Sequence, residues 1–358
     1  MPAIDADAHV VETERTWDFL DASDQKYRPL LVPSPDPKKQ WWIIDDKVRG
    51  FRFPTLTEME LAEASRRAGR HMETPDAARE MDDVELRLRH LDELGIDVQV
   101  LHNTIFIEQV TDRPDTEIAL CWSWNRWLGD IWRQGRGRLL WSCVPSTLSI
   151  PHALEQIRFG KEHGAVTVLM RPIEGHRLMF DPYFYPIYEE ASRLDMAIAV
   201  HIANANPYLA DLLRTPYDPL AGGVSRFRLW DVGFCQGLIM SQLPRLFPDL
   251  RWGFIESAAQ WVPWVHNECV RRAEARGYPL PEDFWAAYKV YVTCQNDDDI
   301  PYIVKYCGER TLVIGTDYGH TDPSSEVDAI AIFKERTDID AGLKEKILYE
   351  NPKTLYGL

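Results

Sequence analysis

The chain has 358 residues and a formal net charge of −16. This length suits one (β/α)₈ barrel with insertions, a fold that is typically about 250 residues long and can exceed 400, so we expect a single domain over residues 1–358. The acidic balance argues against nucleic acid and anionic membranes as partners, because both bind clustered Lys and Arg.

Neither export nor membrane insertion is indicated. The N-terminal residues lack the basic and apolar regions of a signal peptide, and no run of about 18 apolar residues occurs. The six cysteines are far apart and form no C-x-x-C pair, so we expect buried free thiols in a reducing compartment. These features predict a cytoplasmic protein.

Short apolar runs alternate with longer periodic segments, which is typical of repeated βα units around a parallel sheet. Most of the runs are continuous, as expected for strands covered on both faces. The eight predicted strands are Ala3–His9, Val98–His102, Leu139–Val144, Val166–Arg171, Ala197–Ile202, Arg251–Glu256, Val290–Cys294 and Leu312–Asp317.

The segments between these strands have helical periodicity. In the first of them, apolar residues recur at spacings of three and four, and Gly95 stands where a C-terminal cap is expected. The predicted helices are Ala77–Leu94, Asp115–Trp132, a helix from Pro151 to about His163, Pro182–Leu194, Ala258–Ala275, Ile300–Tyr306, Ser325–Glu335 and Ala341–Tyr349.

Two stretches interrupt this rhythm. Lys39–Leu56 predicts a small strand insertion after the first barrel strand, and we expect it to form part of a cap over the substrate. Asn204–Leu229 is a long stretch with Pro and Gly after the fifth strand. Long loops at this end of a barrel usually shape the pocket, although a surface excursion or an oligomer contact is equally compatible.

Chemistry-bearing residues stand at the ends of strands one, five, six and eight. Asp7 and His9 are two apart in a strand and therefore share a face, with Glu12 just beyond. The other strand-end residues are His201, Glu256, Asp317 and, in the following loop, His320. Each residue alone could have a purely structural role, such as a hydrogen-bonded polar residue or a helix cap. Together they converge at the barrel mouth, where buried acids beside histidines require a compensating cation.

Asp7-Ala-His9, His201, Glu256-Ser-Ala-Ala-Gln-Trp261, Gly315-Thr-Asp-Tyr-Gly-His320 and the Leu-Tyr-Gly-Leu tail resemble the amidohydrolase superfamily. The branch most similar to this chain contains aminocarboxymuconate-semialdehyde decarboxylase and γ-resorcylate decarboxylase. The resemblance covers nearly the whole chain and implies a (β/α)₈ barrel with one or two metal ions. It implies that His9, His201 and Asp317 are metal ligands.

Three positions depart from the family pattern. Asp7 replaces the first histidine of the His-x-His motif, and Glu256 replaces the histidine that normally ends strand six. Strand four ends in Arg171 without the lysine that many two-metal members carboxylate. Glu12, Glu256 and His320 are added as metal ligands from their positions alone, and Glu256, Asp317 and His320 are the candidate catalytic groups.

Counting charges favours two divalent ions. Asp7, Glu12, Glu256 and Asp317 would bring four negative charges into one water-poor mouth, which a single ion leaves far from neutral. Oxygen-rich ligand sets with some imidazole suit Fe or Mn, although Zn is also possible. The mononuclear alternative keeps Asp7, His9, His201 and Asp317 as ligands, with Glu256 as a general base.

Three functions stay open. A dinuclear Fe or Mn site suits oxygen activation and hydroxylation of a small organic acid, which we favour. The alternatives are a mononuclear Zn or Mn hydrolase or decarboxylase, and a non-catalytic partner subunit. We expect a homo-oligomer or a hetero-oligomer with related barrels.

Three residues are candidates to bind the substrate. Arg171 can clamp a substrate carboxylate with its planar fork, or form a structural ion pair instead. His102 and Asn103 end strand two and are expected to line the pocket.

Overall fold

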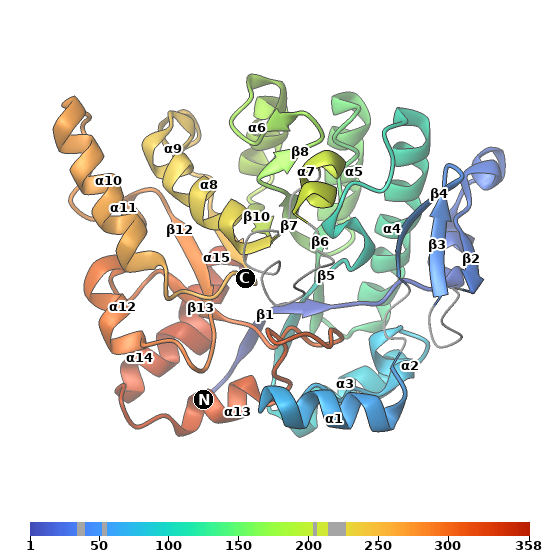
Figure 1. Ribbon diagram of the computed structural model, residues 1–358, viewed down its shortest axis with the longest axis horizontal. Coiled ribbons are helices and arrows are strands. Elements are labelled where there is room, and N and C mark those ends of the chain that lie inside the picture. The colour runs from blue at the N-terminus through green and yellow to red at the C-terminus, as the bar shows by residue number, and fades with distance from the viewer. Residues whose placement is uncertain (34–39, 52–55, 203–205, 214–226) are drawn as a thin grey trace.

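The computed structural model describes residues 1–33, 40–51, 56–202, 206–213 and 227–358. Eight parallel strands form one sheet in the order β1-β5-β6-β7-β10-β11-β12-β13, and helices surround them (Figure 1). The predicted (β/α)₈ class is therefore confirmed. The barrel strands are β1 (Ile4–His9), β5 (Val98–His102), β6 (Leu139–Cys143), β7 (Ala165–Met170), β10 (Ala197–His201), β11 (Trp252–Ile255), β12 (Val290–Cys294) and β13 (Leu312–Ile314).

The helices follow the strands in alternation, as expected for βα units. Among the described residues, none of them combines the length and the apolar character that a membrane span needs. They are α1 (Glu58–Ala68), α2 (Asp76–Arg79), α3 (Val84–Leu94), α4 (Pro114–Gln134), α5 (Ile150–Glu162), α6 (Tyr185–Arg193), α7 (Pro207–Leu212), α8 (Leu229–Met240), α9 (Leu243–Leu246), α10 (Val262–Arg276), α11 (Phe284–Ala287), α12 (Ile300–Cys307), α13 (Ala329–Glu335), α14 (Ala341–Glu345) and α15 (Asn351–Tyr356).

One predicted helix, Ala77–Leu94, is divided into α2 and α3. Between them Met81 has a φ of 57°, in the left-handed region that ends a helix. The Asp83 side chain then accepts the Leu86 N–H at 2.9 Å and caps a new helix. The apolar spacing across the break was correct, but it did not reveal this local hydrogen bond.

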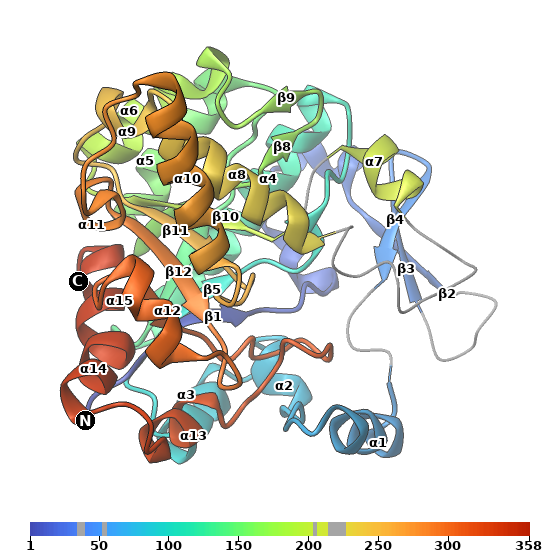
Figure 2. The same cartoon turned by 60° about the vertical axis from the view of Figure 1, so that its left-hand side comes forward.

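The first predicted insertion is a separate antiparallel sheet of β2 (Leu30–Pro33), β3 (Gln40–Ile44) and β4 (Lys47–Phe51). It lies at the periphery of the molecule, apart from the barrel strands (Figure 2). Parts of both predicted insertions, residues 39, 52–55, 204–205 and 214–226, lie outside the described residues. Whether either segment caps a substrate stays a prediction.

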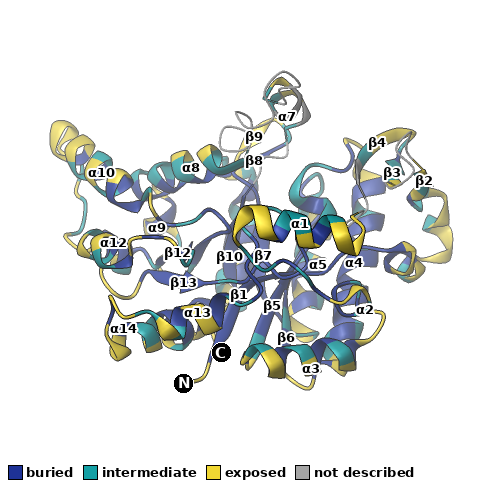
Figure 3. Cartoon of the chain, turned by 60° about the horizontal axis from the view of Figure 1, so that its bottom comes forward, coloured by how far each residue is buried: buried dark blue, intermediate teal, exposed yellow. Residues whose placement is uncertain are grey.

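Two apolar cores flank the barrel strands. The smaller one consists mostly of small and branched side chains together with Tyr291 and Tyr356, and the larger one lies mainly between strands and helices. In Figure 3 the strands are buried, whereas the helices expose their outer faces. The C-terminal tail is helical, and the Tyr356 hydroxyl donates to Ala6 O at 2.7 Å, which ties α15 to β1. All six cysteines are free and buried, as predicted.

The seam between β1 and β13 closes the barrel with few backbone bonds. His9 N–H donates to Tyr318 O and Asp317 N–H donates to Asp7 O, each at 2.8 Å. The buried Asp5 carboxylate accepts from Thr316 N at 2.9 Å and Thr316 Oγ1 at 2.6 Å.

The seam also depends on a glycine. A Cβ at Gly315 would lie 2.2 Å from the Asp7 Cβ, closer than two carbon atoms can approach. The glycine therefore lets the two strands meet where the strand-one acids project.

Candidate metal centre

The candidate functional side chains stand at four strand ends on one rim of the barrel. Asp7 and His9 lie on β1, His201 ends β10, Glu256 follows β11 and Asp317 lies beyond β13. The φ values of Glu256 and Asp317 are 65° and 51°, in the left-handed region that non-glycine residues rarely adopt. Such strain persists where surrounding structure holds it, and it clusters at functional sites.

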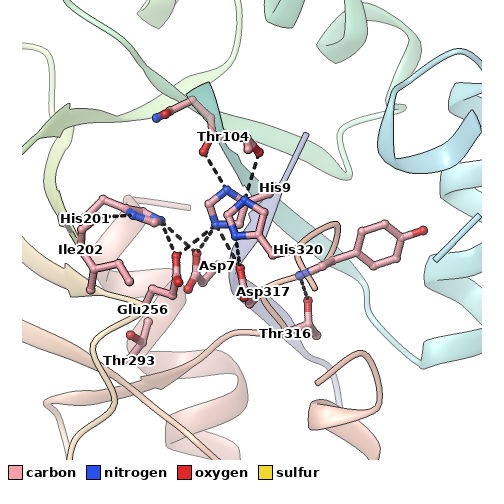
Figure 4. A network of polar contacts seen from close by, with 12 residues as sticks. Asp7, His9, Thr104, His201, Ile202, Glu256, Thr293, Thr316, Asp317 and His320 are labelled. Atoms are coloured by element: carbon pink, nitrogen blue, oxygen red, sulfur yellow. Dashed lines mark hydrogen bonds and ion pairs between the residues drawn. The ribbon is translucent and has the colours of Figure 1, made fainter. Parts of the chain in front are cut away.

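Five buried side-chain atoms of this rim fall outside hydrogen-bond geometry with every described residue: Asp7 Oδ1, His9 Nε2, His201 Nε2, Glu256 Oε2 and Asp317 Oδ1. His9 Nε2 lies 3.4 Å from the Asp7 oxygen and 3.5 Å from that of Glu256 (Figure 4). It lies 3.3 Å from Asp317 Oδ1. His201 Nε2 is 3.5 Å from the same Asp7 and Glu256 oxygens. Orphaned buried polar atoms are rare in folded proteins, so the donor set fits a bound cation.

His9 and His320 are oriented by their outer ring nitrogens. His9 Nδ1 lies 2.8 Å from the Asn103 carbonyl oxygen, and His320 Nε2 lies 3.0 Å from Thr104 Oγ1. Because the Thr104 hydroxyl donates to a backbone carbonyl, its oxygen accepts from His320. The two rings stack at 3.7 Å, and His320 Nδ1 lies 2.9 Å from Asp317 Oδ1. Outer contacts of this kind fix the tautomer of metal-binding histidines.

Two overlapping sets of potential ligands emerge from the described residues. In each set, one ligand atom from every residue lies within 4.8 Å of the others. The sets are Asp7, His9, His201 and Glu256, and then His9, Glu256, Asp317 and His320. Six side chains are thus brought together, with His9 and Glu256 common to both sets.

Burial dominates the protonation of this cluster. It lowers the pKa of His9 to about 3, so the imidazole is neutral and available as a ligand. Burial and the nearby Asp317 raise the pKa of Glu256 well above its ordinary value. Burial opposes ionisation of Asp7 too, but the contacts with His201 and His9 hold its pKa below the usual range. A divalent ion would favour ionised carboxylates throughout.

His320 carries the opposite shift. Although burial works against its charged form, the Asp317 carboxylate raises the pKa of His320 to about 9. Metal coordination through Nδ1 requires that this nitrogen lose its proton, so ion binding and proton release are coupled here.

Glu12 does not join the cluster, contrary to its prediction as a ligand. Its Oε1 accepts from Thr104 N at 3.1 Å and Trp124 Nε1 at 3.0 Å, and its Oε2 accepts from Ile105 N at 3.1 Å. The carboxylate fastens the loop after β5 to α4. The predicted four acids of the mouth, Asp7, Glu12, Glu256 and Asp317, are therefore reduced to three in the described ligand sets.

Arg171 takes the structural role that the sequence left open, and its guanidinium is not free to clamp a substrate. Its Nε lies 2.9 Å from Glu174 Oε1 and a terminal nitrogen lies 2.6 Å from Glu174 Oε2. The other terminal nitrogen donates to Phe106 O at 2.9 Å. All three guanidinium nitrogens of Arg171 therefore donate to groups of the chain itself.

His102 and Asn103 lie beside the cluster. The His102 ring is centred 5.1 Å from that of His201 and 6.0 Å from that of His9. Neither ring nitrogen of His102 nor the Asn103 side-chain amide meets hydrogen-bond geometry with a residue that the structure describes, although both residues are buried. They stay candidates for substrate binding.

Ser325 is a site residue that the sequence did not reveal. Its hydroxyl donates to Asp317 Oδ2 at 2.6 Å, which leaves Oδ1 facing the histidines. Ser325 was expected only to begin a helix, and nothing in its spacing from Asp317 indicated this contact.

Comparison with known proteins decides the family. A family model described as amidohydrolase matches residues 4–358, nearly the whole chain. The chain belongs to this amidohydrolase family. No curated protein matches its sequence significantly.

Solved structures share the fold at low sequence identity. An amidohydrolase from Mycobacterium avium subsp. paratuberculosis K-10 matches with a TM-score of 0.78 and 19% identity, covering 100% of this chain and 98% of its own. The 5-carboxyvanillate decarboxylase of Sphingomonas paucimobilis matches at 0.67 and 15%, covering 100% and 99%. That of Novosphingobium aromaticivorans, complexed with manganese and 4-hydroxy-3-methoxy-5-nitrobenzoic acid, matches at 0.62 and 17%, covering 84% and 93%.

Proposed function

We propose that this amidohydrolase-family enzyme binds two divalent ions, Fe or Mn, and hydroxylates a small organic acid with dioxygen and an external two-electron donor. One oxygen atom would enter the product and the other would leave as water. The observation that carries the proposal is the convergence of six potential ligands in two overlapping sets. Six protein ligands would fill an octahedral shell around one ion and leave no position for substrate or water, whereas catalytic ions keep an open position. Two ions, each held by one of these sets, would use the same side chains and leave positions open.

The ligand types support this choice of metal. Three carboxylates and three imidazoles match the inventory of carboxylate-bridged di-iron and di-manganese sites, and oxygen-rich sets with imidazole suit Fe or Mn. With Glu12 outside the cluster, two divalent ions exceed the three carboxylates by one positive charge. A hydroxide or the carboxylate of the substrate can supply the balancing negative charge.

The chain itself would position the reactants. When bound, the ions would supply Lewis acidity and pass electrons from the external donor to dioxygen. Glu256, held in a strained backbone conformation, would join the two ligand sets. His320 holds a proton at Nε2 for Thr104, and His102 and Asn103 offer unpartnered polar atoms to the substrate. Burial of these groups excludes water from the reacting atoms.

A mononuclear decarboxylase or hydrolase is the second candidate. The ligand atoms around His9 Nε2 lie 3.3–3.5 Å away, a spacing that one coordination sphere also produces. The similar fold of a 5-carboxyvanillate decarboxylase that is complexed with manganese supports this alternative. Asp7, His9, His201 and Asp317 would then hold one ion, and Glu256 would act as a base.

Metal analysis of protein produced in Fe- or Mn-supplemented medium separates these functions. About two equivalents of Fe or Mn is the expected result, with oxygen consumption when an aromatic or alicyclic carboxylic acid is added together with ascorbate as the electron donor. One equivalent of Mn or Zn without oxygen consumption would establish the mononuclear function. Protein that binds neither metal would point to a non-catalytic partner subunit.

Glu256→Gln should lose about one metal equivalent, because an amide cannot bridge two ions. His201→Ala should also lower the metal content. The matched control is Glu12→Gln, which alters a buried acid at the same mouth that lies outside the ligand sets, and its metal content should hold. Full metal content in Glu256→Gln together with lost activity would identify Glu256 as a base and contradict the bridging role.

A further inference from the structure

Arg228 precedes α8 and is half-buried near the mouth of the barrel. One of its terminal nitrogens donates to Ser324 Oγ at 3.0 Å. Among the described residues, no carboxylate lies within ion-pair distance of its guanidinium. The Arg228 guanidinium therefore has further N–H donors besides the one that the neutral Ser324 hydroxyl accepts.

The position of Ser324 places this guanidinium beside the metal centre. The next residue, Ser325, donates directly to the candidate ligand Asp317. Electrostatics agree with that placement: burial and Asp317 raise the pKa of Glu256, and the Arg228 charge acts in the opposite direction. The arginine is thus within electrostatic reach of the ligand cluster.

Other arginines near the mouth are already occupied. Arg171 pairs with Glu174, and Arg79 pairs with Asp76. Arg87 donates from its Nε to a glutamine side chain, and its terminal nitrogens donate to backbone carbonyls. Compared with these three, Arg228 has the guanidinium best able to receive an anion.

We propose that Arg228 binds the carboxylate of the substrate and so sets the distance between this group and the metal centre. The assignment rests on the proposed function in one respect, that the substrate is an organic acid. The planar fork of arginine matches a carboxylate in a bidentate fashion, and the Ser324 contact pre-orients it. In a chain of net charge −16, a cation that has no ion-pair partner among the described residues also distinguishes an anionic substrate from a neutral one.

The test uses metal-loaded full-length protein and carboxylate probes. Wild type and Arg228→Gln are titrated with benzoate, cyclohexanecarboxylate and 4-hydroxy-3-methoxy-5-nitrobenzoate, and binding is followed by the shift in thermal unfolding. We expect Arg228→Gln to weaken carboxylate binding about 10- to 100-fold, the usual effect of losing a charged hydrogen-bond pair. Benzamide, a neutral analogue, should not distinguish the two proteins.

Two further variants sharpen the result. Arg228→Lys keeps the charge and should recover part of the affinity. Arg177→Gln removes an arginine that already pairs with Asp181, and it should bind the probes as wild type does. The assignment is overturned if no carboxylate stabilises wild type, if wild type and Arg228→Gln respond equally, or if Arg228→Gln loses metal. A single metal equivalent in wild type would instead refute the two-ion function and leave the Arg228 assignment standing.

Discussion

Two groups of buried acids lie at the mouth of the barrel and differ in how far the chain supplies them with hydrogen-bond donors. In the first, the metal cluster, Asp7, Glu256 and Asp317 each have a buried oxygen outside hydrogen-bond geometry with the described residues. In the second, which we call the β7 corner, Arg171, Glu174 and Glu117 lie at and beyond the end of β7 and on the adjoining α4.

The β7 corner satisfies its charges internally. Arg171 forms a two-pronged pair with Glu174, and Glu117 accepts the Leu148 N–H at 2.7 Å. The Thr147 hydroxyl lies within 3.4 Å of both acids. The comparison teaches that a buried acid with a structural role is supplied with donors by the chain. An acid left without them indicates that something outside the chain is to bind there.

The largest effect is expected when the buried ion pair of the β7 corner is removed. Arg171→Gln leaves Glu174 buried without its cation, which typically costs about 3–5 kcal/mol of folding stability. Chemical denaturation measures the loss, and the metal content of the folded fraction should not change. A stability loss below about 1 kcal/mol, with weaker binding of benzoate, would return Arg171 to the role of a substrate clamp.

The metal cluster can be tested through Ser325, a residue that orients a potential ligand without being one itself. Ser325→Ala deletes the donor to Asp317 Oδ2 and lets the carboxylate turn. We expect metal affinity to fall about 10- to 100-fold, as for other orienting contacts, with little change in unfolding temperature. Ser324→Ala is the neighbouring control, and competition with a chelator measures both. Equal metal affinity in all three proteins would mean that Ser325 does not position the ligand.

A third prediction concerns the protonation of the β7 corner. Burial raises the pKa of Glu117 to about 7 from an ordinary 4.5. Between these values the folded chain retains a proton that the unfolded chain releases, so this residue makes stability fall as the pH rises through that window.

Glu117→Gln should remove this contribution, at most about one proton, while its amide oxygen still accepts from Leu148. Unfolding free energies measured from pH 4.5 to 7 test the change. An identical pH dependence in wild type and variant would show that Glu117 is ionised throughout.

The strand pattern was predictable because it is local. Continuous apolar runs bounded by helical periodicity identified all eight barrel strands, and the strand-end positions of His9, His201 and Asp317 predicted that these residues meet. A closed parallel barrel brings the same strand ends to one rim regardless of the details of packing. The division of Ala77–Leu94 was missed because a single cap at Asp83 outweighed a helical pattern.

The sequence by itself thus determined the barrel and the meeting of acids and histidines at its mouth. Only the tertiary structure decided which acids stay unpaired. Glu12 and Arg171 carry the right chemistry at strand ends, but residues distant in sequence, Trp124 and Phe106, complete their hydrogen bonds. Sequence position shows that a buried charge needs a partner, whereas the identity of the partner depends on distances of about 3 Å that folding alone establishes.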